Sequence, residues 1–186
     1  MSRLQRKRLD ELTAEQRQAY DKVVENRPVK PDDGHIGGPF DAWIRSPEMG
    51  TRLVGLGGFF RFRTTVDRRY VEVVILVTGQ FWQAQFEWWA HEPMARDAGV
   101  PDSVIAAIKA AQEPVFDDPG DAAAWRLARE IHTTHRLSDA TFAEAKAQFG
   151  ETGVAELLGL AGFYTAVSMT LNGFEVELPE GAQAPF

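Results

Sequence analysis

The feature that most restricts the fold of this chain is a missing pattern. No run of residues alternates between apolar and polar side chains with turns at both ends, as a half-buried strand would. Apolar residues recur instead at the helical spacing of three and four, and helix-capping residues precede several of these segments. The sequence therefore predicts an all-α protein, a bundle of about eight helices.

The expected helices begin at capping residues and end near glycine or proline. Ser46 caps a helix that has Pro47 at its first position and runs to about residue 62. A long central helix is expected over 67–99, with a kink just before Pro93, because proline lacks the backbone donor. The other helices are expected at 13–25, 40–45, 101–111, 121–134, 139–149 and 152–171.

Four glycines lie inside the helix that Ser46 caps: Gly50, Gly55, Gly57 and Gly58. Each glycine in a helix interior costs about 1 kcal/mol relative to alanine. Close helix packing or room for a ligand is the expected reason for keeping them.

Composition narrows the class of protein. The 186 residues carry a net charge of −7, which is a poor match for nucleic acid or anionic membranes. The N-terminal segment is charged and lacks the apolar stretch of a secretory signal. The longest apolar runs fall short of the roughly 20 residues that a membrane helix needs. We therefore expect a cytoplasmic protein with no nucleic-acid or membrane partner.

Two residues of the central segment, Glu87 and His91, form the strongest candidate for chemistry. They are four positions apart, so a helix places them on one face, one turn from each other. A carboxylate at that distance orients an imidazole and raises its pKa, which suits proton transfer near neutral pH. The alternative is a core histidine that is hydrogen-bonded to Glu87 or to a backbone carbonyl.

Glu72 is a further catalytic candidate, nineteen residues before His91. On a continuous helix that separation is about five turns, so contact between them requires a break, for which Gly79 offers a place. The alternative is a buried structural glutamate that pairs with Arg68 or Arg69.

Several other side chains are candidates for binding a substrate. Arg61 and Arg63 could each bind a substrate carboxylate through two hydrogen bonds. The alternative is that each forms a salt bridge with a Glu or Asp of the protein. The hydroxyl of Tyr164, on an otherwise apolar helix, needs a partner, either a ligand or a backbone carbonyl. His35, in a glycine-rich loop, either covers a pocket or is solvated. Phe59 is an expected wall residue. Trp82, Trp88 and Trp89 cannot share one helical face, so one or two of them line a pocket and the rest lie in the core or in oligomer contacts.

A metal site has two possible origins. Glu87 and His91 could share an ion with Glu72 or His35 as a third ligand, and His132 and His135 form a second pair. Neither set is complete at a diagnostic spacing, so no metal is expected. His132 and His135 are interpreted as surface residues near a helix C-terminus, where the helix dipole favours them.

The central segment resembles the carboxymuconolactone decarboxylase family, which includes the alkylhydroperoxidase AhpD. The AhpD signature has a Glu nineteen positions before a His, with C-x-x-C between them. Glu72 and His91 keep this spacing, whereas the cysteine positions fall on Ala84 and Glu87. The decarboxylase branch is closer. The segments that match it are 72–76, Glu87-Trp88, Gly38-Pro39-Phe40, Ser46-Pro47-Glu48, Arg61-Phe62, 162–172 and 178–181.

The resemblance implies an all-helical AhpD-like fold over residues 28–186, preceded by a helical arm over 1–27, in a trimer or hexamer. It implies a cofactor-independent decarboxylase or isomerase-type lyase that acts on a small carboxylated lactone or a related acid of aromatic catabolism. His91 with Glu87 would deliver the proton, and Arg61 or Arg63 would hold the substrate. The alternative is a non-catalytic oligomeric protein that binds such a ligand. Thiol-dependent peroxidase chemistry is excluded, because the chain has no cysteine.

Overall fold

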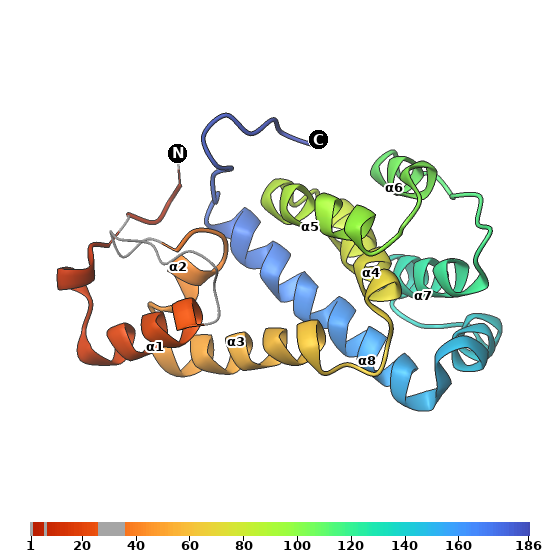
Figure 1. Ribbon diagram of the computed structural model, residues 1–186, viewed down its shortest axis with the longest axis horizontal. Coiled ribbons are helices and arrows are strands. Elements are labelled where there is room, and N and C mark those ends of the chain that lie inside the picture. Colours follow the sequence, from red (N-terminus) through yellow and green to blue (C-terminus); the bar gives the residue numbers. More distant parts are fainter. Residues whose placement is uncertain (1, 6, 26–35) are drawn as a thin grey trace.

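The computed structural model describes residues 2–5, 7–25 and 36–186, and these residues form helices and no strand (Figure 1). The all-α class is confirmed. The helices, preceded by the 3-10 turn η1 (Leu9–Glu11), are α1 (Ala14–Glu25), α2 (Phe40–Trp43), α3 (Pro47–Phe62), α4 (Arg68–Phe81), α5 (Gln85–Asp97), α6 (Asp102–Lys109), α7 (Pro119–Thr134) and α8 (Asp139–Gly173).

The prediction of one long central helix is wrong, because this segment forms two helices, α4 and α5, joined by a tight turn. The N–H of Gln83 bonds the carbonyl of Gln80 at 3.0 Å, and the N–H of Ala84 bonds the carbonyl of Gly79 at 2.9 Å. These two bonds are the Schellman pattern that ends a helix, and it requires a left-handed residue, here Gln83 with φ 49°. Glycine usually fills that position, so the sequence carries no signal for this turn.

No break occurs at Pro93, because α5 continues through this residue to Asp97. Proline removes one backbone donor, which leaves the carbonyl of Trp89 without its helical partner. Both residues lie on the exposed side of α5, where water can bond that carbonyl. The helix therefore needs no break there.

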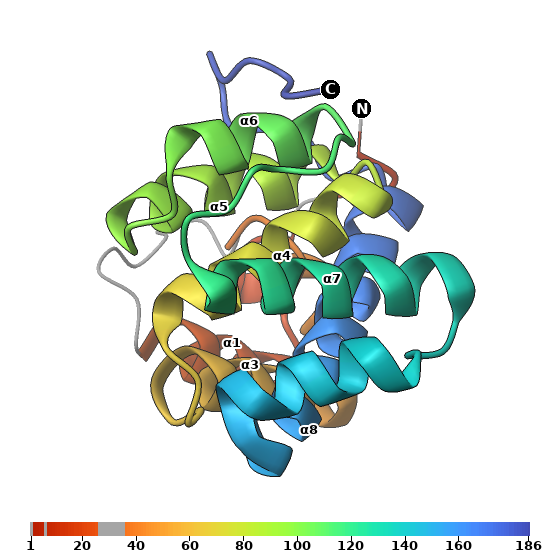
Figure 2. The same cartoon turned by 90° about the vertical axis from the view of Figure 1, so that its right-hand side faces the viewer.

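The helix α4 is the centre of the fold and packs against α5, α6, α7 and α8 (Figure 2). Its nine residues from 71 to 79 are all buried. A Cβ atom on Gly79, near the end of α4, would lie 3.7 Å from Glu87 Cγ, near the start of α5. Since His91, further along α5, contacts Glu72, nearer the start of α4, α5 folds back along α4.

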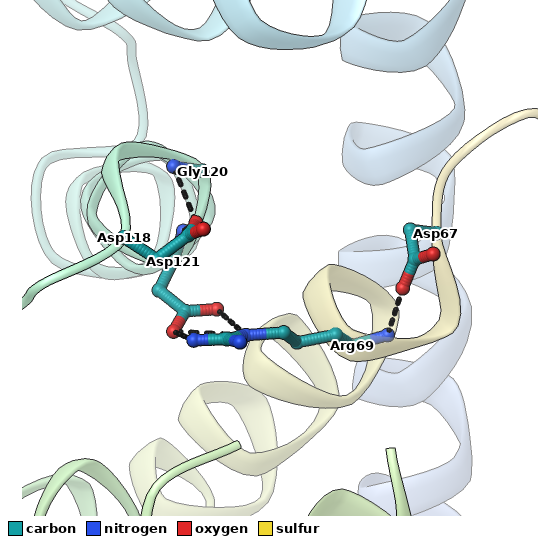
Figure 3. Close-up of polar contacts among 5 residues, drawn as sticks. All are labelled: Asp67, Arg69, Asp118, Gly120 and Asp121. Atoms are coloured by element: carbon teal, nitrogen blue, oxygen red, sulfur yellow. Dashed lines mark hydrogen bonds and ion pairs between the residues drawn. The ribbon is translucent and has the colours of Figure 1, made fainter. Parts of the chain in front are cut away.

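The start of α4 is joined to the start of α7 by a buried ion pair (Figure 3). Arg69 Nε donates to both carboxylate oxygens of Asp121, at 2.9 and 3.1 Å. Asp67 caps α4 by accepting from the backbone N–H of Arg69, and Asp118 caps α7 in the same way. Arg69 is thus paired with Asp121, while Arg68 pairs with Glu72, one helical turn further along α4.

The helix α1 packs on α3, on the side of the molecule away from α6 and α7 (Figure 1). It contributes to a second buried cluster that is separate from the main core. The members of this cluster are Ala19, Tyr20, Val23, Val24, Ile36 and Ile44. The division into an arm and a domain at residue 27 stays a prediction.

The helix α8 crosses the molecule between α3 and α4 (Figure 1). It bends at Gly150, whose φ of 67° and ψ of 176° are not helical, close to the division expected between 149 and 152. By length and composition α8 resembles a membrane span, but half of its apolar window is buried within the fold. A core helix has the same composition when other helices cover it.

Substitution by alanine is expected to have opposite effects on stability at two of the α3 glycines, Gly50 and Gly55. A Cβ atom at Gly50 would lie 2.4 Å from the carbonyl oxygen of Trp43, whereas a Cβ at Gly55 would meet no atom within 4 Å. We expect Gly50→Ala to destabilise the protein by about 2 kcal/mol or more, because backbone must move. We expect Gly55→Ala to stabilise it by about 1 kcal/mol through helix propensity. Urea unfolding of the two variants checks this, and equal effects would contradict it.

Candidate functional site

A cavity of about 240 Å³ lies between α1, α3, α5 and α8. Its wall combines apolar and aromatic side chains with five that can carry charge or donate a proton, which is the usual make-up of a small-molecule site. Those five are Lys22, Arg61, Glu87, His91 and Tyr164. A larger hollow of about 580 Å³ lies beside the C-terminal tail, and among the described residues its ionisable lining side chains are Asp41, Glu177 and Glu180. The smaller cavity is therefore the candidate site.

The imidazole of His91 lies between two buried carboxylates. Its Nδ1 is 2.8 Å from Glu72 Oε2, and its Nε2 is 3.1 Å from Glu87 Oε1. The other oxygen of Glu72 is paired with the guanidinium of Arg68. Glu72 is fully buried, and the side chains of Glu87 and His91 are 5% and 11% exposed. The result is a chain of alternating charge that runs from Arg68 to Glu87.

This arrangement depends on the turn between α4 and α5. The sequence places Glu72 and His91 about five turns apart on one helix, and contact required a break. The structure has that break at residues 82–84, beyond Gly79, so Glu72 makes both of the contacts that were weighed for it, while its catalytic role stays a prediction. Its carboxylate contacts His91 through one oxygen and Arg68 through the other.

The two carboxylates control the charge of His91. Burial disfavours the charged imidazolium, but the charge of Glu87 and the hydrogen bond to Glu72 outweigh it. Together they raise the pKa of His91 from 6.5 to about 9. At neutral pH His91 is therefore an imidazolium, a potential proton donor in the wall of the cavity.

Tyr164, on α8, is the second proton-bearing group beside the histidine. The two rings meet edge to face, with centroids 5.2 Å apart and an interplanar angle of 86°. Burial and the charge of Glu87 raise the pKa of Tyr164 well above its usual value. Its hydroxyl therefore stays protonated and available as a hydrogen-bond donor.

Two cations from distant segments border the same cavity. Arg61, near the end of α3, contacts the ring of Phe62 at 5.1 Å, and Lys22 projects from α1. Within the described part of the chain, no carboxylate pairs with either cation. Arg63 ends α3 outside the cavity, with its guanidinium over the ring of Phe59 at 5.9 Å, and Phe59 is also absent from the wall. Sequence reasoning missed Lys22, because nothing local indicates that α1 packs on α3 beside the cavity.

The tryptophans of the central segment lie outside the cavity. Trp88 is fully buried, and its Nε1 donates to Glu92 at 2.6 Å. The Nε1 of Trp82 donates to Thr165 at 3.3 Å, and Trp89 is partly exposed. The aromatic wall comes instead from Phe86 on α5 and from Phe40, Trp43 and Phe163 on α2 and α8, with Phe62 as its exposed member.

Of the histidines outside α5, His132 and His135 lie away from the cavity, and His35 lies outside the described residues. His132 is wrongly interpreted as a surface residue, because its Nε2 is 2.9 Å from Thr78 Oγ1 and its ring stacks on Phe81. Burial lowers the pKa of His132, against the direction expected from a helix dipole. His135 is exposed and ends α7 in a left-handed conformation.

No group of three or more ligating side chains in the described residues is arranged to hold a metal ion. The site itself shows a physical reason. Glu72 and Glu87 approach opposite edges of the His91 ring, at Nδ1 and Nε2, so their oxygens do not converge on one point.

Comparison with known proteins supports the fold. The structure is similar to the crystal structure of the debrominase Bmp8 in its apo form, with a TM-score of 0.68 over 90% of this chain and 87% of that chain. The two sequences are 11% identical, so the likeness concerns the fold alone. No protein-family model matches this sequence, and no curated protein matches it. Membership of the carboxymuconolactone decarboxylase family stays a prediction.

Proposed function

We propose that this protein is a cofactor-independent lyase, of the decarboxylase or isomerase type, that acts on a small carboxylated lactone or a related enolisable acid. The observation that carries the proposal is the imidazole ring of His91, held between Glu72 and Glu87 at the wall of a cavity. The same wall presents Arg61, which pairs with no carboxylate among the described residues. Perturbed titratable groups at a concave site are typical of catalytic residues. The resemblance to the carboxymuconolactone decarboxylase family agrees with this chemistry.

In the decarboxylation that we propose, the carbon–carbon bond to the leaving carboxylate breaks and carbon dioxide departs. The electron pair passes into the conjugated carbonyl of the substrate itself. The Nε2–H of His91 then protonates the resulting carbanionic carbon, which leaves a neutral imidazole. Glu72 accepts from Nδ1–H throughout, so it holds the tautomer that the reaction leaves behind. Solvent returns the proton to Nε2, and the cycle is complete.

The remaining residues of the cavity bind the substrate in this proposal. Arg61 holds a substrate carboxylate, and the aromatic wall leaves the departing carboxylate poorly solvated. In an isomerisation, Glu87 would take the proton from one carbon and His91 would return one to another. The trimer or hexamer implied by the family resemblance is part of the same proposal, and light scattering of the purified protein tests it.

The first experiment is an assay of the purified protein with carboxylated lactones and β-keto acids. Carbon dioxide release and lactone absorbance are followed together, so decarboxylation and isomerisation are distinguished. Turnover supports the lyase. Tight binding of a panel member without any product would support the alternative, an oligomeric protein that binds the ligand.

The pH dependence of turnover is a specific expectation. Because the pKa of His91 is about 9, the imidazolium is present below that pH and is lost as pH rises through it. We expect kcat/KM to fall by about tenfold per pH unit above about 9. Steady-state rates between pH 6 and 10.5 check this. A rate that rises through pH 9 would show that neutral His91, acting as a base, is the active form.

A further inference from the structure

The hydroxyl of Tyr164 is a buried donor with no role in the reaction proposed for His91 and Arg61. The residue is 5% exposed and borders the cavity. The sequence left two partners open for this hydroxyl, a backbone carbonyl or a ligand. In the structure no described residue forms a hydrogen bond with it, through either backbone or side chain. The backbone alternative is therefore excluded, and the ligand remains.

The oxygen of this hydroxyl is open to the cavity. Three buried side-chain oxygens of the described residues lack a hydrogen bond and are fully enclosed by protein atoms, namely Glu72 Oε1, Glu87 Oε1 and Ser168 Oγ. The hydroxyl oxygen of Tyr164 also lacks a hydrogen bond, but it is not one of these enclosed atoms. Because Tyr164 is otherwise buried and borders the cavity, the accessible surface of its oxygen lies there.

The hydroxyl keeps its proton under ordinary conditions. Burial and the negative charges of Glu87 and Glu72 raise the pKa of Tyr164, and the positive charges of Arg68 and Arg61 do not outweigh them. Tyr164 is therefore a neutral phenol that donates a hydrogen bond and does not act as a base.

We infer that the hydroxyl of Tyr164 donates a hydrogen bond to a carbonyl oxygen of the ligand. The inference rests on the proposed function, in which this oxygen receives the electron pair of the carbon–carbon bond when carbon dioxide leaves. The oxygen then carries the negative charge of an enolate, and Tyr164 keeps its proton throughout. A donor fixed in advance at the oxygen where charge develops stabilises the transition state more than the bound substrate.

The position of Tyr164 beside His91 fits this role. In an enolate a single carbon separates the oxygen from the carbon that becomes protonated, so the donors to these two atoms have to be neighbours. The rings of Tyr164 and His91 meet edge to face, with centroids 5.2 Å apart. Arg61 and Lys22 border the same cavity and supply positive charge for the ligand carboxylate. The ligand class is therefore a small acid whose carbonyl oxygen lies beside the carbon that accepts the proton.

The test measures binding first and does not depend on turnover. Isothermal titration at pH 7 compares 5-oxotetrahydrofuran-3-carboxylate, a saturated lactone, with tetrahydrofuran-3-carboxylate, which has the same ring and carboxylate but no carbonyl. We expect the wild-type protein to bind the lactone about fivefold more tightly, the effect of one added hydrogen bond. In Tyr164→Phe, which lacks only the hydroxyl, the ratio is expected to fall to about one.

Two control variants separate this contact from the rest of the site. Tyr70→Phe should keep the wild-type ratio, because Tyr70 packs against Phe149 on α8 and does not border the cavity. Arg61→Met should weaken both probes by a similar factor and leave their ratio unchanged, because it removes only the carboxylate contact.

A stability measurement excludes a structural role for the hydroxyl. A hydroxyl that is bonded within the protein stabilises the fold, whereas removal of one without a partner is neutral or favourable. We therefore expect Tyr164→Phe to unfold in urea at or above the wild-type midpoint when no ligand is present. A clearly lower midpoint would show that the hydroxyl has a partner in the protein and would overturn the inference.

The inference would also be wrong if the wild-type protein bound both probes equally or bound neither. A preference for the lactone that survived in Tyr164→Phe would have the same meaning. Where a lactone or β-keto acid is turned over, Tyr164→Phe should lower kcat by about 10²- to 10³-fold, and an unchanged kcat would count against Tyr164. A lactone preference that depends on Tyr164, without any turnover, would uphold the contact and count against the proposed lyase.

Discussion

Replacing His91 by asparagine is expected to lower turnover by about 10²- to 10⁴-fold, the usual contribution of a positioned proton donor. The imidazolium that would protonate the carbanion in the proposed reaction is lost, while asparagine keeps a polar side chain next to Glu72. Steady-state kinetics on whichever substrate the wild-type protein decarboxylates give the comparison. Circular dichroism confirms that the variant remains helical.

The matched control is His132→Asn. His132 is also a partly buried histidine, but it lies on α7, bonded to Thr78 and stacked on Phe81. Its replacement should leave kcat within about twofold of the wild-type value, because it donates no proton to the cavity. Should His91→Asn retain wild-type turnover, the assignment of His91 as proton donor would be wrong, and Tyr164 would be the next donor to examine.

Replacing Glu72 by glutamine is expected to lower the free energy of unfolding by about 3–5 kcal/mol at pH 7, the range found when one partner of a buried ion pair is removed. Glu72 is fully buried and meets two positive groups, Arg68 and the imidazolium of His91. Without the carboxylate, these two cations lie close together with only Glu87 to balance them. Urea unfolding, followed by circular dichroism, measures the loss.

Glu48→Gln is the matched control for this change. Glu48 also pairs with an arginine one helical turn away, Arg52, but both side chains are about four-fifths exposed. Exposed pairs contribute about 1 kcal/mol or less, so this variant should unfold close to the wild-type midpoint. If the two glutamine variants were equally stable, the buried pair would not hold α4 and α5 together.

Much of the fold follows from local signals in the sequence. Ser46 with Pro47 marks the start of α3, and the division of α8 near Gly150 falls where a new cap was expected. The turn after α4 carries no such signal, because Gln83 occupies a position where glycine is common. A prediction based on caps therefore runs through it and places the break at Pro93 instead.

Some of the residues that line the candidate cavity were expected from the sequence, namely Arg61, Glu87, His91 and Tyr164, but their geometry was not. The spacing of Glu87 and His91 needs only a helix, and both residues lie at the cavity. The contact between Glu72 and His91 needs the turn, and the position of Lys22 needs the packing of α1 on α3, which no local pattern encodes. Trp88 was one of three tryptophans expected to supply the pocket wall. It lies about 100° further around α5 than Glu87, and its side chain is buried in the core.

The turn at residues 82–84 also sets the angular phase between two helices. Each residue of an α-helix advances the side-chain direction by about 100°, so one inserted residue would rotate His91 away from Glu72 while leaving both helices intact. The connection between α6 and α7 carries no such constraint, since none of its residues borders the cavity. Length variation among natural relatives of this chain should therefore be absent from the first connection and tolerated in the second.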